Sequence, residues 1–139
     1  MVPTALLLLA AAASPAAHAT PQAVVRTMFD AFNRHDAIAL AALYAEDARL
    51  ASSDFCAGRT GRAEVVRTYR ALFERFPDIR DEVKDVLVDG DRVAVRFVAR
   101  SGQGAEPLAL PIATFLVVDL GLVRSDDSLF DTAGRPCEP

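Results

Sequence analysis

The sequence holds few of the residues from which metal and nucleotide sites are built. Its 139 residues include only two histidines, His18 and His35, and two cysteines, Cys56 and Cys137. Zinc sites combine several histidine, cysteine or carboxylate ligands at short spacings, and this chain offers no such group. No glycine-rich phosphate-binding loop follows a predicted strand. We therefore expect no metal and no other cofactor.

Positive charge is also scarce. The formal net charge is −4 at pH 7, and Lys84 is the only lysine. A mildly acidic chain is poorly suited to binding nucleic acid or anionic lipid. Long apolar runs are absent as well, because the run at residues 6–13 is too short to cross a bilayer as a helix. We expect no nucleic-acid partner, and no membrane partner once residues 1–19 are removed.

Residues 1–19 have the features of a signal peptide. Residues 6–13 form a short apolar core, and Ala17-His18-Ala19 supplies small residues where a signal peptidase reads them. We expect cleavage before Thr20, which leaves one domain over residues 20–139 in an exported protein, either periplasmic or secreted. Residues 1–4 carry no lysine or arginine, so an unprocessed N-terminal tail is the alternative.

Both cysteines belong to the expected mature chain. An even number of cysteines in an exported protein suggests a disulfide, here between Cys56 and Cys137. Closing so long a loop would stabilise the fold by about 4–5 kcal/mol in the chain-entropy treatment. The alternative is two separate thiols, buried or exposed.

The spacing of apolar residues changes near the middle of the chain, from a helical to a strand-like period. Helical spacing of apolar residues predicts helices over residues 21–34 and 61–76, and Asp36 looks like the N-cap of a shorter helix between them, with Ile38 turned inward. After Pro77 the pattern becomes strand-like, and Gly90-Asp91 predicts a hairpin turn. The expected strands cover residues 47–50, 83–89, 92–100, 108–119 and 122–131. Helices grouped before an antiparallel sheet indicate an α+β fold.

Several short segments follow one another in a recognisable order. They are Val24-Val25-Arg26 with Phe29 to Asn33, Leu43 to Ala48, Asp89 to Val93, Pro111 to Phe115, and Leu129 to Asp131. Their order and spacing resemble the nuclear transport factor 2-like superfamily, and its SnoaL-like and ketosteroid isomerase branches come closest. This resemblance implies three N-terminal helices packed on a strongly curved antiparallel sheet, in a cone shape with a central apolar pocket. Such a fold hosts enzymes, binders and transport factors alike.

The ketosteroid isomerases that the chain resembles use a tyrosine in the first helix, an aspartate base after the first strand and a protonated aspartate in the penultimate strand. Position by position, these three residues correspond to Met28, Ser52 and Ala113. None of these side chains can supply the same chemistry, so we reject steroid isomerisation. Tyr69 matches a tyrosine that supports the isomerase site.

Asp126 is the best remaining acid. Strand alternation puts Asp126 and Arg124 on one face and Val123 on the other, and the resemblance makes the first of these faces the pocket wall. A carboxyl buried there would have a raised pKa and could act as a general acid or base, as in the similar polyketide cyclases. The alternatives are a non-catalytic role in the pocket, an ion pair with Arg124 or Arg49, or a position near the end of the strand in water.

Asp54 could replace the missing base if the first strand continues past Ser52, although solvation in a loop or capping of a turn is the alternative. The pocket lining implied by the resemblance comprises Met28, Phe32, Ser52, Tyr69, Phe97, Ala113, Phe115, Ser128 and Phe130. We expect the disulfide to tie down the loop that covers the pocket mouth.

These residues favour a protein that binds a small hydrophobic molecule without turning it over. One alternative is an enzyme of the cyclase, isomerase or hydratase type that uses Asp126, with Asp54 as a second candidate acid. The other is a module that binds a partner or forms a homodimer through the open face of the sheet.

Overall fold

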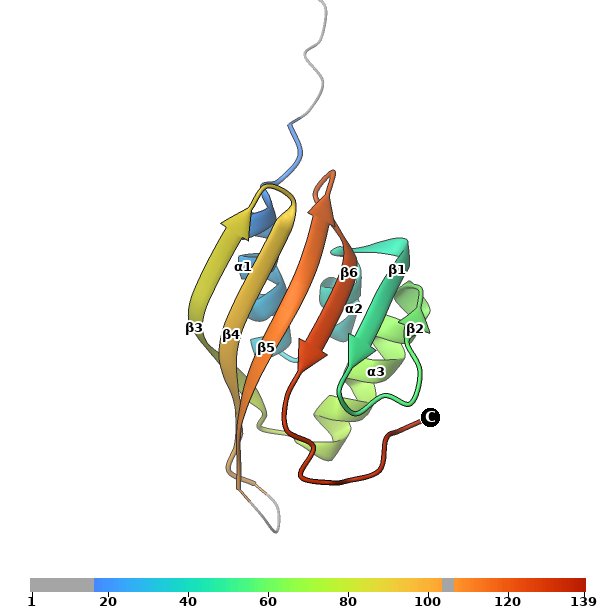
Figure 1. Ribbon diagram of the computed structural model, residues 1–139, viewed down its shortest axis with the longest axis vertical. Coiled ribbons are helices and arrows are strands. Elements are labelled where there is room, and N and C mark those ends of the chain that lie inside the picture. Colours follow the sequence, from blue (N-terminus) through green and yellow to red (C-terminus); the bar gives the residue numbers. More distant parts are fainter. Residues whose placement is uncertain (1–16, 104–106) are drawn as a thin grey trace, which may run out of the picture.

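The computed structural model describes residues 17–103 and 107–139 (Figure 1). The elements in chain order are α1 (Pro21–Asn33), α2 (Ala37–Ala41), β1 (Tyr44–Ser52), β2 (Arg59–Thr60), α3 (Arg62–Arg75), β3 (Arg80–Asp89), β4 (Arg92–Ser101), β5 (Leu108–Asp119) and β6 (Leu122–Leu129). The six strands form one curved open sheet in the order β2-β1-β6-β5-β4-β3, and the helices cover one of its faces (Figure 1). The predicted α+β class is confirmed.

The sequence predicted a wholly antiparallel sheet, and this prediction is wrong because the sheet is mixed. β3, β4, β5 and β6 form an antiparallel meander, but β6 then lies parallel to β1. The parallel pair arises because the last strand returns beside the first one after the long connection through α3 and the meander. β1 is also longer than the predicted residues 47–50, since the buried residues Tyr44 and Ala45 begin it.

Local signals explain the helices. Thr20 caps α1 by accepting a hydrogen bond from the backbone amide of Ala23, and Asp36 caps α2 in the same way through Ala39 at 2.8 Å. The apolar stripe of α1 is buried against the sheet. The inward position predicted for Ile38 is wrong, because this side chain is 58% exposed. With only five residues, α2 buries little more than Leu40 together with Ala37 and Ala41.

The alternation of buried and exposed residues explains which side chains of the central strands face the core. Val93, Val95, Phe97 and Ala99 of β4 are buried, as predicted, and Gly90 makes the hairpin turn before them with a φ of 59°. On β6 the alternation is interrupted. Val118 pairs with Val123 while Val117 pairs with Ser125, so Arg124 is an extra residue in a β-bulge. The bulge lets Val123 and Asp126 both be buried, and the prediction that they lie on opposite faces is therefore wrong.

The predicted disulfide between Cys56 and Cys137 is present, with Cα atoms 4.9 Å apart. Backbone hydrogen bonds reinforce it: the Cys56 amide donates to the Glu138 carbonyl at 2.8 Å, and the Glu138 amide donates to the Asp54 carbonyl at 2.6 Å. The C-terminal segment is therefore fastened to the loop between β1 and β2. None of the helices within residues 17–103 and 107–139 is long and apolar enough to span a membrane.

Candidate functional site

A cavity of about 510 Å³ lies between the helices and the sheet. All three helices, all six strands and the C-terminal segment contribute to its lining. The walls are mainly apolar, with Phe29 and Phe32 from α1, Phe76 after α3, Phe97 from β4 and Ile112 from β5. Polar side chains from several elements interrupt these walls, and two of them are buried aspartates.

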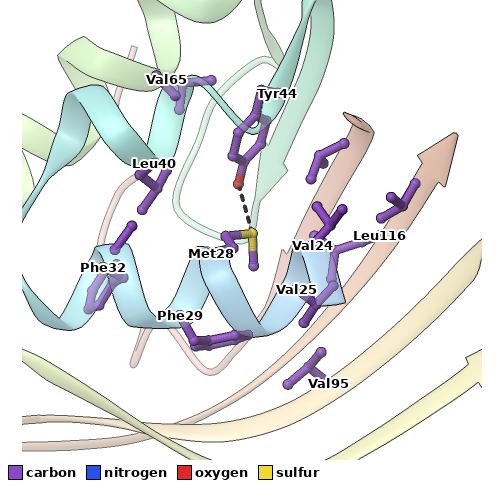
Figure 2. Close-up of a cluster of buried hydrophobic side chains, with 14 of the residues drawn as sticks. Val24, Val25, Met28, Phe29, Phe32, Leu40, Tyr44, Val65, Val95 and Leu116 are labelled. Carbon is purple, nitrogen blue, oxygen red and sulfur yellow. Dashed lines mark hydrogen bonds between the residues drawn. The ribbon is translucent and has the colours of Figure 1, made fainter. Parts of the chain in front are cut away.

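Asp126 is one of these buried acids, with 6% of its surface exposed. β6 lies between β1 and β5, and each neighbouring strand supplies a hydroxyl to its carboxyl. Tyr44 of β1 donates to Oδ2 at 2.7 Å, and Thr114 of β5 donates to Oδ1 at 2.5 Å. Figure 2 shows the Tyr44 hydroxyl directed toward the sulfur of Met28, at 3.4 Å. The alternative partner Arg124 instead lies 3.8 Å from Asp47.

The surroundings of Asp126 favour its protonated form. Burial raises the pKa of this carboxyl, and the hydrogen bonds from Thr114 and Tyr44 offset only part of that rise. Burial, followed by the negative charge of Asp126, raises the pKa of Tyr44, so this phenol remains a donor. Ser128 donates to the Thr114 hydroxyl at 3.1 Å and extends the network along the cavity wall. A carboxyl with a raised pKa, held by such donors, can take up and return a proton.

Asp81 is the second buried acid, and sequence reasoning missed it. It lines the cavity from β3, is 8% exposed, and its Oδ1 has no hydrogen-bond partner among the described residues. Burial raises the pKa of Asp81 to about 8. The expected strand began at Val83, but β3 begins at Arg80. The available signal was that Asp81 lies in phase with Val83, two residues later in the strand.

Tyr69 of α3 faces the cavity, and Phe32 packs edge-on against its ring with the centroids 5.8 Å apart. Burial is the main reason that the pKa of Tyr69 is raised, and the negative charge of Asp126 and then that of Asp81 contribute in the same direction. Because both carboxylates influence it, the phenol lies within electrostatic reach of both acids. It is neutral over the ordinary pH range.

The loop after β1 and the C-terminal segment form another part of the cavity lining. Ser52 donates to Asp54 Oδ1 at 2.5 Å, and both residues line the cavity together with Phe130. The Arg59 guanidinium lies 3.7 Å from the centre of the Phe55 ring. This wall is the part of the cavity that the disulfide fastens.

Two of the expected lining residues lie elsewhere. Ala113 and Phe115 are on the outer face of β5, where Phe115 is 52% exposed, and the residue between them, Thr114, faces the cavity. The cause is the two-residue period of the strand, which places residues of even number inside. The other expected residues do line the cavity: Met28, Phe32, Ser52, Asp54, Tyr69, Phe97, Asp126, Ser128 and Phe130. The described residues contain no group of three metal-ligating side chains.

A family model of the SnoaL-like domain matches residues 25–125, which is most of the chain. The chain belongs to the SnoaL-like domain family. None of the curated proteins matches this SnoaL-like chain. Many solved structures share its fold, which is that of the NTF2-like proteins.

Three of these structures illustrate the range of proteins that share the fold of this SnoaL-like chain. IdmH from Streptomyces antibioticus, a proposed polyketide cyclase, has 23% identity and a TM-score of 0.74, over 83% of this chain and 94% of its own. A proposed ketosteroid isomerase from Kribbella flavida has 29% identity and a TM-score of 0.67, over 86% and 83%. A protein with a ketosteroid isomerase-like fold from Catenulispora acidiphila, in complex with trimethylamine, has 21% identity and a TM-score of 0.71, over 78% of this chain and 85% of its own.

Proposed function

We propose that this SnoaL-like domain binds a small, largely apolar molecule in its cavity, which narrows as a cone between the helices and the curved sheet. The observation that carries the proposal is a cavity of about 510 Å³ whose aromatic and aliphatic walls are interrupted by polar side chains, among them Asp81 and Asp126. Mainly apolar walls with inward polar groups are typical of small-molecule sites. The trimethylamine complex of the Catenulispora relative supports small-ligand binding in this fold.

Filling the cavity tests this proposal. Ala99 lines the cavity on β4, whereas Ala113 lies on the outer face of β5, so the same alanine-to-leucine change can be made inside and outside. We expect Ala99→Leu to weaken binding of 1-octanol, measured by isothermal titration calorimetry, and Ala113→Leu to leave it unchanged. Native mass spectrometry of the purified protein should also show a bound small molecule. Absence of binding by the wild type, or equal effects of the two variants, would overturn the proposal.

A second candidate function is proton transfer by Asp126 in an enzyme of the cyclase, isomerase or hydratase type. It is favoured by one observation, the raised pKa of a cavity-lining carboxyl that Tyr44 and Thr114 hold in place. IdmH, described as a proposed polyketide cyclase, lends support from the same fold. Asp54, bonded to Ser52 on the same lining, is the alternative acid.

Deuterium exchange at the carbon next to a carbonyl distinguishes proton transfer by the domain from binding alone. In heavy water, the wild type should speed exchange at the α-carbon of 1-tetralone, a compact aromatic ketone, above the protein-free rate. Asp126→Asn keeps the shape of the side chain and should abolish this acceleration while 1-tetralone still binds, and Asp54→Asn is the parallel test of the other acid. Binding without acceleration by the wild type would leave the domain as a binder.

The outer face of the sheet supports self-association. Phe115 and Leu129 are 52% and 50% exposed, and the strand register places them on this uncovered face together with Ala113. We propose that two copies pair through it. Sedimentation velocity should show a dimer at micromolar concentration that Phe115→Glu dissociates, whereas a monomeric wild type would refute the pairing.

Export is the proposed localisation. A disulfide is typical of proteins that reach an oxidising compartment, and the bond between Cys56 and Cys137 supports a periplasmic or secreted protein. The proposed signal peptide, residues 1–19, lies mostly outside the described residues. The mass of the protein recovered from the periplasm or the medium should correspond to a chain that begins at Thr20.

A further inference from the structure

We infer that Asp81 is the acceptor for the basic nitrogen of a hydrophobic amine bound in the cavity, at a site separate from Asp126. This inference rests on the proposed small-molecule function and specifies the ligand class. It starts from a position that neither the family resemblance nor the predicted site included.

Asp81 and Asp126 belong to different walls. Asp81 is on β3, the edge strand, and Asp126 is on β6, so β4 and β5 lie between them. Three strand spacings of about 4.8 Å each separate the two strands along the sheet. A ligand group at Asp81 is therefore distinct from one at the Tyr44–Asp126–Thr114 network, and one elongated molecule could reach both.

The backbone of Asp81 is fixed in place. The Asn33 side chain at the end of α1 donates to the Asp81 carbonyl at 3.0 Å and accepts from the Asp81 amide at 2.8 Å. The carboxyl consequently stays on the cavity wall although Oδ1 finds no partner among the residues that the structure describes. An unpaired buried carboxyl is unfavourable, and a ligand that donates a hydrogen bond to Oδ1 would remove this cost.

The groups that face Asp81 favour a cationic donor over a neutral one. From α3 comes the neutral phenol of Tyr69, from α1 the amide of Asn33, and from β4 the opposite residue is Ala99. The nearby imidazole of His35 is engaged with the Ile79 carbonyl at 2.7 Å. Tyr69, Asn33 and Ala99 carry no positive charge that would neutralise the carboxylate, and burial is what raises the pKa of Asp81.

The positive side chains that line the cavity come from other segments and have partners there. Arg75 forms an ion pair with Glu138 at 3.1 Å, Arg59 donates to Thr68 at 2.9 Å, and Arg135 donates to the Thr132 carbonyl at 3.0 Å. The aromatic wall adds a second attraction, because ring faces such as those of Phe29 and Phe97 stabilise a nearby cation. An ammonium group on an apolar chain matches this combination.

A pair of ligands that differ only in the head group tests the inference. Octylamine and 1-octanol have chains of equal length, and at about pH 8.5 the amine is still mostly protonated. We expect calorimetry on the full protein to give octylamine a Kd at least about tenfold lower than that of 1-octanol, since a charged hydrogen bond is stronger than a neutral one. Asp81→Asn should remove this preference and leave the Kd of 1-octanol within about twofold.

Glu82→Gln is the matched control, because it removes one negative charge from the adjacent, exposed position of β3. It should keep the preference for the amine. If 1-octanol binds but the wild type does not prefer octylamine, or if Glu82→Gln abolishes the preference as Asp81→Asn does, the inference is wrong and the binding function stands. If neither ligand binds the wild type, the proposed function itself fails. A wild type that binds the two ligands equally well refutes the inference even if Asp81→Asn does not fold.

Discussion

Asp126 and Asp81 are both buried, but they differ in the donors around them. Hydroxyls from two neighbouring strands bond the Asp126 carboxyl, whereas Oδ1 of Asp81 has none among the described residues. The sequence could indicate Asp126 because it lies within an obvious strand near the other expected lining residues. It could not indicate Tyr44 as the partner of Asp126, because the two residues are far apart in the chain and only the β1–β6 pairing joins them.

The raised pKa of Asp81 predicts a loss of stability with increasing pH. Its carboxyl has an ordinary pKa of 3.8 in the unfolded chain and a pKa of about 8 in the fold. Between these values the unfolded chain loses the proton and the folded protein keeps it, so the free energy of unfolding falls as pH rises from about 4 to about 8. Each pKa unit corresponds to about 1.4 kcal/mol, and the total loss should reach several kcal/mol.

Asp81→Asn should flatten this dependence, because an amide does not ionise. Urea unfolding of both proteins at about pH 5 and pH 8.5 measures the effect. Some slope should persist in the variant, since burial raises the pKa of Asp126 too and gives a contribution of the same sign. Identical slopes for wild type and variant would contradict the prediction.

Tyr44→Phe should lower the free energy of unfolding by about 1–3 kcal/mol, because it leaves Oδ2 of the buried Asp126 without this donor. The same substitution in an Asp126→Leu background should cost much less, since no carboxyl then needs a partner. Denaturant unfolding of the four proteins gives the coupling between the two residues. Equal costs in the two backgrounds would show that the hydrogen bond contributes no stability.

At the scale of elements, local signals explain most of what the sequence predicted. The helix caps, the helix end at Pro77 and the turn at Gly90 each depend on residues within one turn of the chain. The features that it missed are non-local: the parallel β1–β6 pair and the bulge at Arg124 both result from how distant strands meet. The bulge also decides the site, because it allows Asp126 to face inward beside the buried Val123.

The short helix α2 should depend strongly on its cap. Asp36→Ala removes the acceptor for the Ala39 amide and should cost about 1 kcal/mol of stability, measured by thermal or denaturant unfolding. Asp30→Ala is the matched control, because Asp30 is exposed near the C-terminal end of α1, where a negative charge opposes the helix dipole. A larger cost for the control than for Asp36→Ala would exclude a specific role of the cap.

At the scale of the whole molecule, the cavity is assembled from both ends of the chain. The N-terminal helices form one side, the meander forms the other, and the C-terminal segment closes in through the disulfide and its backbone hydrogen bonds to the loop after β1 (Figure 1). The sequence predicted the disulfide from the even cysteine count. The inward turn of Thr114 in place of Ala113 needed the strand register, which no local pattern fixes.

Removing the disulfide should loosen this closure. The double variant Cys56→Ser, Cys137→Ser should lose up to about 4–5 kcal/mol of stability, and a bound ligand should dissociate faster because the C-terminal segment lines the cavity. Unfolding and stopped-flow measurements test both effects, with reduced wild-type protein as the control. An intact mass that reduction leaves unchanged, instead of rising by about 2 Da, would show that the bond is not formed.

The position of β6 has a consequence for how the chain reaches its final form. This strand comes last in the chain order yet lies between β1 and β5. The edges of β1 and β5 that pair with β6 therefore stay unpaired until residues 122–129 have been synthesised. Contacts between such distant segments form slowly. A product that ended before Leu122 would present two open strand edges, which invite pairing between copies and aggregation. Premature termination should therefore yield insoluble material rather than a smaller folded domain.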